Sequence, residues 1–220
     1  MINNFFNKVF VITTSVKTDR HDYIKKFLYE HRIQAEIIFA PPKRYCIHFD
    51  TEDLWGTRLI HNQAYVSLTS AYYSIFASCI YHNHENVLIM EDDIHFENDF
   101  ESKFFKFMKH LPEDWGYLNL GYCKTKLIPN GWKVYDVNDY VSEVDVAWTT
   151  HITAYRNKDI CQKLMERMDK VNDSIEFVLN YYTHIDKSFK GYTPKDILCT
   201  QLSYRDANSI HQVFKSLIYS

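Results

Sequence analysis

The hydrophobic pattern divides the chain into short apolar runs and longer amphipathic segments. A short continuous apolar run indicates a strand in a sheet covered on both faces, and apolar residues three or four apart indicate a helix. The polar residues 14–20 are expected to form a turn. The expected strands are 8–13, 35–39, 87–90, 117–120, 134–135 and 148–155, and the expected helices are 22–31, 63–81, 99–110, 157–169 and 174–182. Strands that alternate with helices predict an α/β fold with a mostly parallel central sheet, built by residues 1–220 as a single domain.

One of these runs leads directly into three acidic residues. The apolar residues 87–90 are followed by Glu91, Asp92 and Asp93, after which apolar character returns. Like charges this close repel, so one carboxyl would become neutral unless a cation lay among them. Acids at the carboxyl end of a buried strand lie where α/β sheets bind ligands, and Mg²⁺ and Mn²⁺ share such oxygen ligands with phosphates. The pattern favours a metal-diphosphate site; a solvated acidic turn is the alternative.

Composition narrows the kinds of partner. The 220 residues include only 5 Gly, and no G-x-G-x-x-G or G-x-x-x-x-G-K pattern occurs, so a nucleotide would be held without a Gly-rich loop. The net charge of −3 gives no nucleic-acid footprint. The 5 Cys lack C-x-x-C spacing, which argues against zinc and favours reduced thiols. Without an apolar stretch of about 18 residues or a signal-peptide pattern, we expect a cytoplasmic protein.

Several segments resemble glycosyltransferase family 25, which includes bacterial lipooligosaccharide galactosyltransferases and collagen galactosyltransferases. The sharpest match is that of residues 87–93 to the family's I-L-E-D-D block. Residues 9–12 and 18–20 resemble its opening strand and D-R turn, and residues 68–70 stand where the family has L-S-H. Residues 148–155 and the segment from Pro194 to Asp206 follow later family segments more loosely. The resemblance implies a GT-A-like nucleotide-binding fold, a UDP-sugar donor and Mn²⁺ (or Mg²⁺).

The chain departs from the family pattern at three places, one of which is the run of residues 62–65, where the family usually has glycines. Thr69-Ser70 replaces a Ser-His pair, and Thr150-His151 stands in place of a Gly-Thr pair. These changes bear on the choice of donor and acceptor more than on the fold. They also leave room for a family member with altered or lost activity.

Strand alternation assigns roles to the three acids. Residues two apart on an extended strand share a face, so Glu91 and Asp93 would lie on one side and Asp92 on the other. Asp93 is expected to be the main metal ligand, with Glu91 binding the metal through water or holding the ribose. Asp92 is expected to turn inward and cap backbone N–H groups, or to share the metal if the strand breaks there.

Other candidates come from distant parts of the chain. We expect four residues near the donor nucleotide: Arg20, Thr69, Ser70 and Asp92. Arg20 is placed there because the loop after the first strand opens at the same edge of the sheet as the acids. Thr69 and Ser70 are placed there because they stand at the position of the family's L-S-H segment. Asp186 is the candidate catalytic base or a holder of the sugar, and a base must lie within hydrogen-bond reach of the acceptor hydroxyl.

Histidines and aromatic residues complete the candidate site. His211 is the expected third metal ligand, with His184 and His151 as the alternatives. Aromatic rings can stack on a base or a sugar, and core packing is the alternative for each of them. The stacking candidates are Tyr122 and Trp148. The pair His82 and His84 would lie at the opposite edge of the sheet from the acids.

These features predict a metal-dependent hexosyltransferase that moves galactose or glucose from a UDP-sugar to a hydroxyl of a glycan or protein acceptor. One alternative is a catalytically silent domain of the same fold that binds a sugar, a nucleotide or a partner protein. Another is a metal-dependent phosphohydrolase, since acids after a strand also suit two-metal hydrolysis. The sequence contains no D-x-D-x-T/V run, which disfavours the hydrolase.

Overall fold

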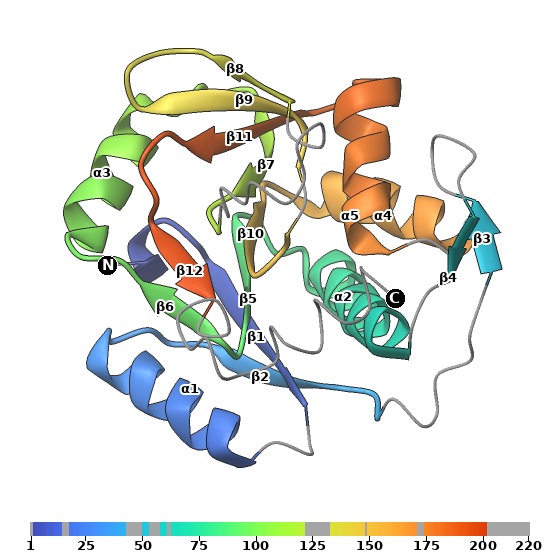
Figure 1. The fold of residues 1–220 in the computed structure, drawn as a ribbon, viewed down its shortest axis with the longest axis horizontal. Coiled ribbons are helices and arrows are strands. Elements are labelled where there is room, and N and C mark those ends of the chain that lie inside the picture. Colours follow the sequence, from blue (N-terminus) through green and yellow to red (C-terminus); the bar gives the residue numbers. More distant parts are fainter. Residues whose placement is uncertain are drawn as a thin grey trace.

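The structure, a computed structural model, describes residues 2–14, 18–42, 50–52, 58–60, 63–121, 133–147, 149–170 and 174–201. Within these ranges the chain forms an eight-stranded sheet with helices on both faces (Figure 1). The strands of this sheet, in spatial order, are β2 (Glu36–Ala40), β1 (Lys8–Thr14), β5 (Val87–Glu91), β10 (Ile152–Tyr155), β7 (Trp115–Asn119), β11 (Lys190–Pro194), β9 (Val141–Val146) and β8 (Lys133–Asp136).

The remaining elements connect or cover this sheet. Two small sheets pair β6 (Ile94–Phe96) with β12 (Cys199–Gln201), and β3 (Asp50–Glu52) with β4 (Arg58–Ile60). The helices are α1 (Thr18–Glu30), α2 (Gln63–His82), α3 (Phe100–His110), α4 (Lys158–Lys170) and α5 (Ile175–Asn180), with the short 3-10 turn η1 (Ile2–Asn4). A π-helical segment, η3 (Tyr181–Asp186), follows α5 directly.

The predicted α/β fold is confirmed, and the apolar run 87–90 is an interior strand between β1 and β10. The sheet is more mixed than the sequence predicted. Strands β2, β1 and β5 are parallel, but β10 enters between β5 and β7 antiparallel to both. Strand β11 is parallel to β7, and β9 and β8 extend the sheet in antiparallel fashion. The parallel part therefore gathers the carboxyl ends of β1 and β5 at one edge.

Several elements differ from the sequence prediction, among them the expected strand 148–155, of which β10 (Ile152–Tyr155) is the part that forms a strand in the described residues. Helix α1 begins at Thr18, so residues 18–20 are its first helical turn and not part of the expected loop. Polar residues are well tolerated in the first turn of a helix, which is why the hydrophobic pattern did not reveal this turn. Six strands were not predicted. β9 and β11 are at least as long as β5 but lack its continuous apolar run, and β3, β4, β6 and β12 are only three residues long.

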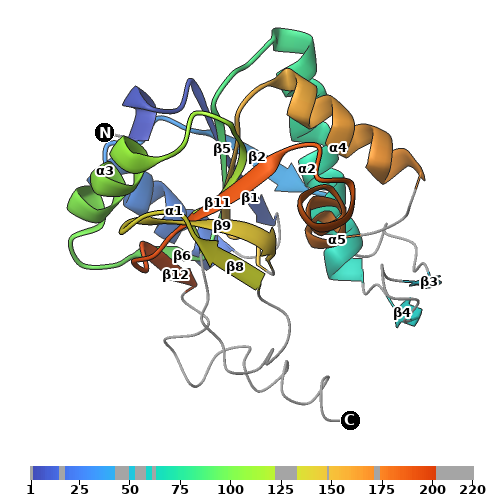
Figure 2. The same cartoon turned by 90° about the horizontal axis from the view of Figure 1, so that it is seen from above.

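Two hydrophobic layers hold the helices on the sheet. Helices α1 and α3 cover one face, and α2, α4 and α5 cover the other (Figure 2). In β5 the side chains of Leu88 and Met90 pack on the α1/α3 side, whereas those of Val87 and Ile89 pack on the α2/α4/α5 side. This alternation fixes which face each residue after the strand can reach.

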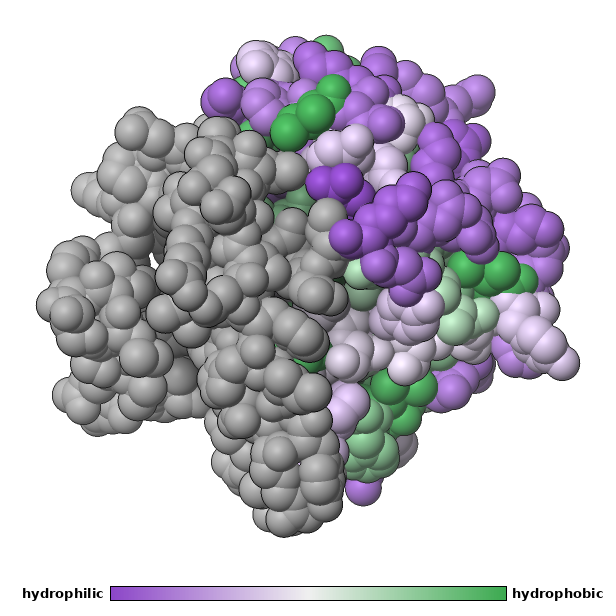
Figure 3. Space-filling model, turned by 90° about the vertical axis from the view of Figure 1, so that its right-hand side faces the viewer, coloured by the Kyte–Doolittle hydropathy of each residue, from purple (hydrophilic) through white to green (hydrophobic). Residues whose placement is uncertain are grey.

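The described residues contain neither a disulfide bond nor a helix suited to span a membrane. Cys79, Cys161 and Cys199 are free and buried, as expected of structural thiols. Among the residues described, none of the helices combines the length and apolar character that a bilayer-spanning segment requires. The described part of the face turned to the viewer in Figure 3 is mainly hydrophilic, with separate small hydrophobic areas.

Candidate active site

The candidate site lies at the edge where β1 and β5 end. Thr13 comes near the end of β1, and Glu91 is the last residue of β5. The chain turns at Asp92 and Asp93 before β6 begins. The three acids therefore occupy the carboxyl edge of parallel strands, as the sequence predicted.

Asp92 faces the α1 side of the sheet and is almost fully buried, at 3% exposure. Its Oδ2 accepts a hydrogen bond of 2.7 Å from Thr13 Oγ1, and its Oδ1 lies 2.8 Å from Arg20 Nη1. Asp92 turns inward as expected, but these partners are side chains rather than backbone N–H groups. A buried carboxylate that is both hydrogen-bonded and ion-paired contributes to folding.

Arg20 joins Asp92 to Asp93. Its Nη2 lies 3.2 Å from Asp93 Oδ2, while Nη1 holds Asp92. Burial alone would lower the pKa of Arg20, but the charges of Asp93 and Asp92 outweigh burial and raise the pKa. The prediction that Asp93 would lie apart from Asp92 is wrong, because the strand ends at Glu91 and a turn carries Asp93 toward Arg20. Asp93 stays close enough to Glu91 for its charge to raise the pKa of that side chain.

Glu91 faces the opposite side of the sheet, toward α5. Thr150 Oγ1 lies 3.2 Å from Glu91 Oε1 and 3.5 Å from Glu176 Oε1. Burial, and then the charges of Asp93 and Glu176, raise the pKa of Glu91 well above its usual value. A hydroxyl has one hydrogen and so donates to one carboxylate at a time.

The segment carrying Thr150 is held firmly against these acids. The backbone N–H of Glu91 donates to the carbonyl of His151 at 2.8 Å, and Tyr72 OH donates to the carbonyl of Thr150 at 2.8 Å. Burial lowers the pKa of His151 to about 3, so its imidazole is neutral. The side chain of Thr150 therefore has a fixed place between two acids.

Thr69, Ser70 and Asp186 do not touch the acids in any described contact. Ser70 Oγ donates to the carbonyl of Val66 in its own helix, a common use of a helical serine. Thr69 and Ser70 do lie within one turn of Tyr72, so they are close to the site along α2. Asp186 is exposed at the end of η3, ten residues beyond Glu176.

The histidine candidates are separated in the structure. His184 Nδ1 pairs with Asp145 at 2.8 Å and not with Glu91 or Asp93. His82 and His84 precede the amino end of β5, opposite the acids, as the sequence predicted. Three candidates lie outside the described ranges: His211, Tyr122 and Trp148. Within those ranges, no group of three or more His, Cys, Asp or Glu could hold a metal ion.

Four residues of the site were missed by sequence reasoning. Thr13 had a usable signal, because it follows Val9 and Val11 in the alternation of a strand that ends at the ligand edge. Glu176, Thr150 and Tyr72 had none, since they come from a helix start, a strand connection and an aromatic-rich helix. Only the tertiary structure brings these three residues to Glu91.

Replacing Glu91 with Gln should change how stability depends on pH. The raised pKa of Glu91 means that the folded protein holds a proton which the unfolded chain releases more readily. This stabilisation is fully present below the unfolded pKa of about 4.3 and is lost as the pH rises through the raised folded pKa. Gln cannot ionise, so the Glu91→Gln variant should not lose this stabilisation. Its free energy of unfolding should therefore increase relative to that of the wild type as the pH rises.

Urea unfolding from about pH 4 to pH 8 measures this difference. The control is Glu143→Gln, which makes the same change at a side chain that is 38% exposed. A free-energy difference between Glu91→Gln and the wild type that stays constant with pH would contradict the raised pKa.

The region that carries these acids matches a known protein family. The profile of glycosyltransferase family 25 (LPS biosynthesis protein) matches residues 69–182, which is more than half of the 220 residues. The chain belongs to glycosyltransferase family 25. The matched region includes the turn at Asp92 and Asp93 as well as Glu91, Thr150 and Glu176, whereas Thr13 and Arg20 lie before it.

Among characterised members of family 25, the chain is similar to two animal proteins. It is 25% identical over 130 residues to procollagen galactosyltransferase 2 of Mus musculus and 26% identical over 132 residues to that of Homo sapiens. Each match covers 53% of this chain and 21% of the relative. The chain thus corresponds to about a fifth of the length of these relatives.

A solved glycosyltransferase shares the fold of this family 25 chain. It is the glycosyltransferase involved in the glycosylation of the major capsid of PBCV-1. The TM-score is 0.50 at 8% identity, over 97% of this chain and 100% of that one. At this identity the likeness concerns the fold alone, and it agrees with the predicted glycosyltransferase architecture.

Proposed function

We propose that this protein transfers a hexose from a UDP-sugar to a hydroxyl group of a glycan or protein acceptor. The observation that carries the proposal is the arrangement of the acids in a member of family 25. Asp92 and Asp93 meet Arg20 on one side of the turn, and Glu91 meets Glu176 through Thr150 on the other. Galactose is our first choice of sugar, because the two relatives are named galactosyltransferases.

A divalent cation fits the chemistry of these residues. Asp93 and Glu91 supply hard oxygen ligands, and the contact of Asp93 with Arg20 is the longer of the two arginine contacts, at 3.2 Å against 2.8 Å. Mg²⁺ is commonly bound through one or two carboxylates together with substrate phosphates and water, so no three-residue protein cluster is required. We propose that Mn²⁺ or Mg²⁺ is held by Asp93 and Glu91, with His211 as the third protein ligand. When bound, the ion would neutralise charge on the departing diphosphate.

The contacts favour Glu176 as the base that receives the proton of the acceptor hydroxyl. Glu176 lies beside the acids, with its Oε1 3.5 Å from the Thr150 hydroxyl that also contacts Glu91. An ionised carboxylate at the site can accept a proton if the acceptor hydroxyl comes within hydrogen-bond reach. Asp186, exposed at the end of η3, is the second choice for this role or for holding the sugar.

Mn²⁺ should raise the affinity of the protein for UDP. The expected gain is at least about tenfold, since each tenfold change corresponds to about 1.4 kcal/mol of binding free energy. Calorimetric titration of UDP into the protein, with Mn²⁺ and with EDTA, measures this gain. Equal affinity in both conditions would argue against a metal in donor binding and leave Arg20 as the cation at the site.

A panel of nucleotide sugars separates transfer from binding alone. If UDP-sugars bind but no acceptor is glycosylated, the silent-domain alternative is favoured, because it shares the fold and the binding residues. Release of phosphate from simple esters without sugar transfer would favour the phosphohydrolase. Transfer to a hydroxyl acceptor supports the proposal.

A further inference from the structure

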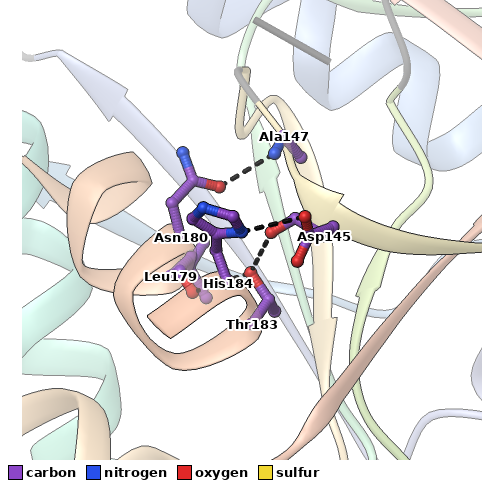
Figure 4. Close-up of polar contacts among 6 residues, drawn as sticks. All are labelled: Asp145, Ala147, Leu179, Asn180, Thr183 and His184. Carbon is purple, nitrogen blue, oxygen red and sulfur yellow. Dashed lines mark hydrogen bonds and ion pairs between the residues drawn. The ribbon is translucent and has the colours of Figure 1, made fainter. Parts of the chain in front are cut away.

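A row of polar contacts joins α5 and η3 to the end of β9 and the residues that follow it. The Asn180 Oδ1 accepts from the backbone N–H of Ala147 at 2.8 Å, and Thr183 Oγ1 donates to the carbonyl of Asp145 at 2.8 Å. His184 Nδ1 lies 2.8 Å from Asp145 Oδ2, the position of an N–H that donates to a carboxylate. Figure 4 shows these side chains of the helix pointing toward residues 145–147.

The row continues into the candidate active site. Further along the same two segments, Glu176 meets Thr150 at 3.5 Å. The two segments thus run in opposite directions, with His184 against Asp145 at one end and Glu176 against Thr150 at the other. Because α5 and η3 are continuous, fixing one end of this row restricts how far the other end can shift.

The pair of Asp145 and His184 is well suited to fix that end. Asp145 is buried at 9% exposure, and the side chain of His184 is 28% exposed. Hydrogen bonds to a carboxylate are among the stronger ones in proteins, and partial burial protects them from competition with water. η3 is π-helical, and such segments often occur near functional sites.

We propose that His184 and Asp145 are positioning residues for the transfer reaction. They hold Asp145 and Ala147 on the helix, so that the hydroxyl of Thr150 stays between Glu91 and Glu176. The effect on catalysis rests on the proposed glycosyltransferase function, whereas the effect on the position of Thr150 does not. His184 and Asp145 themselves touch neither donor nor acceptor in this scheme.

The test compares three variants of the full chain. His184→Ala removes the contact with Asp145, and His184→Asn places an amide N–H where Nδ1 stood. Lys195→Ala is the control, because it removes the contact of Lys195 with Asp136 at 3.0 Å, from a side chain of similar exposure at 31%. Steady-state kinetics with a UDP-sugar should show kcat lowered about tenfold in His184→Ala, with the donor KM within about twofold of wild type. His184→Asn and Lys195→Ala should retain most of the wild-type kcat.

A second measurement does not depend on activity. The Glu91 amide donates to the carbonyl of His151, so looser positioning of Thr150 and His151 should speed hydrogen exchange at the Glu91 amide. Mass spectrometry of a peptide spanning residues 87–96 should show faster deuterium uptake in His184→Ala, and not in His184→Asn or Lys195→Ala.

The outcomes separate this inference from the proposed function. Unchanged uptake and unchanged kcat in His184→Ala would overturn the positioning role, as would equal losses in the Ala and Asn variants. Faster uptake in a protein whose wild type transfers no sugar would keep the structural role and overturn the proposed function. If His184→Ala lost transfer activity but kept the wild-type deuterium uptake, His184 would not act on the reaction through the position of Thr150.

Discussion

Replacing Asp93 with Asn should lower the rate of sugar transfer at least about a hundredfold, or about 2.7 kcal/mol of transition-state stabilisation. Asn keeps the shape of the side chain and removes the negative charge that a cation needs. The fold should be retained, because Asp93 is the more weakly held of the two aspartates on Arg20, at 3.2 Å against 2.8 Å. Removing one of three neighbouring acids also relieves repulsion.

The measurements for Asp93→Asn are initial rates of transfer, UDP affinity with Mn²⁺, and the melting temperature. Asp139→Asn is the matched control, since it makes the same change at an exposed acid in a turn. If Asp93→Asn kept both the transfer rate and the UDP affinity of the wild type, the metal role proposed for Asp93 would be wrong.

Asp92→Asn should produce the opposite result, a less stable protein that retains most of its activity once folded. Its carboxylate is buried, accepts from Thr13 and pairs with Arg20, so neutralising it weakens two contacts at once. Breaking a buried, hydrogen-bonded charge pair by changing one partner typically costs a few kcal/mol, and Asp93 remains to balance part of the Arg20 charge. We expect a loss of about 2 kcal/mol in the free energy of unfolding, or about 4–8 °C in Tm.

Urea denaturation and the rate of transfer per folded molecule measure the effect of Asp92→Asn. Thr13→Val is the companion variant, because it removes the hydroxyl and leaves the charge pair of Asp92 and Arg20 in place. It should lose about 1 kcal/mol, the usual net value of one hydrogen bond. A stable Asp92→Asn variant without transfer activity would instead make Asp92 a direct participant in the reaction.

The sequence predicted the parts of this protein that depend on local patterns. Residues 87–90 form an interior strand because a continuous apolar run has few other stable locations. The acids at its end could be placed at the ligand edge for the same reason. The match to a family block then narrowed the chemistry from a generic metal-diphosphate site to sugar transfer.

The sequence failed where the structure depends on turns and on contacts between distant residues. Alternation separated Asp93 from Asp92, but the backbone turns after Glu91 and both aspartates reach Arg20. A rule for extended strands does not apply beyond the last paired residue. Glu176 is 85 positions from Glu91, and its place at the site follows from the packing of α5 against the segment before β10. No local pattern distinguishes Glu176 from an ordinary acid in the first turn of a helix.

The position of β10 between β5 and β7 has a consequence for the nascent chain during synthesis. β5 ends at Glu91, and its neighbour β10 begins at Ile152, about 60 residues later. At synthesis rates of about 5–20 residues per second, the nascent chain therefore presents one unpaired edge of its most apolar strand for several seconds. An open, apolar strand edge readily recruits other strands. Chaperones that shield such an edge, or slower protein production at lower temperature, should therefore matter more for the yield of this protein than its thermodynamic stability does.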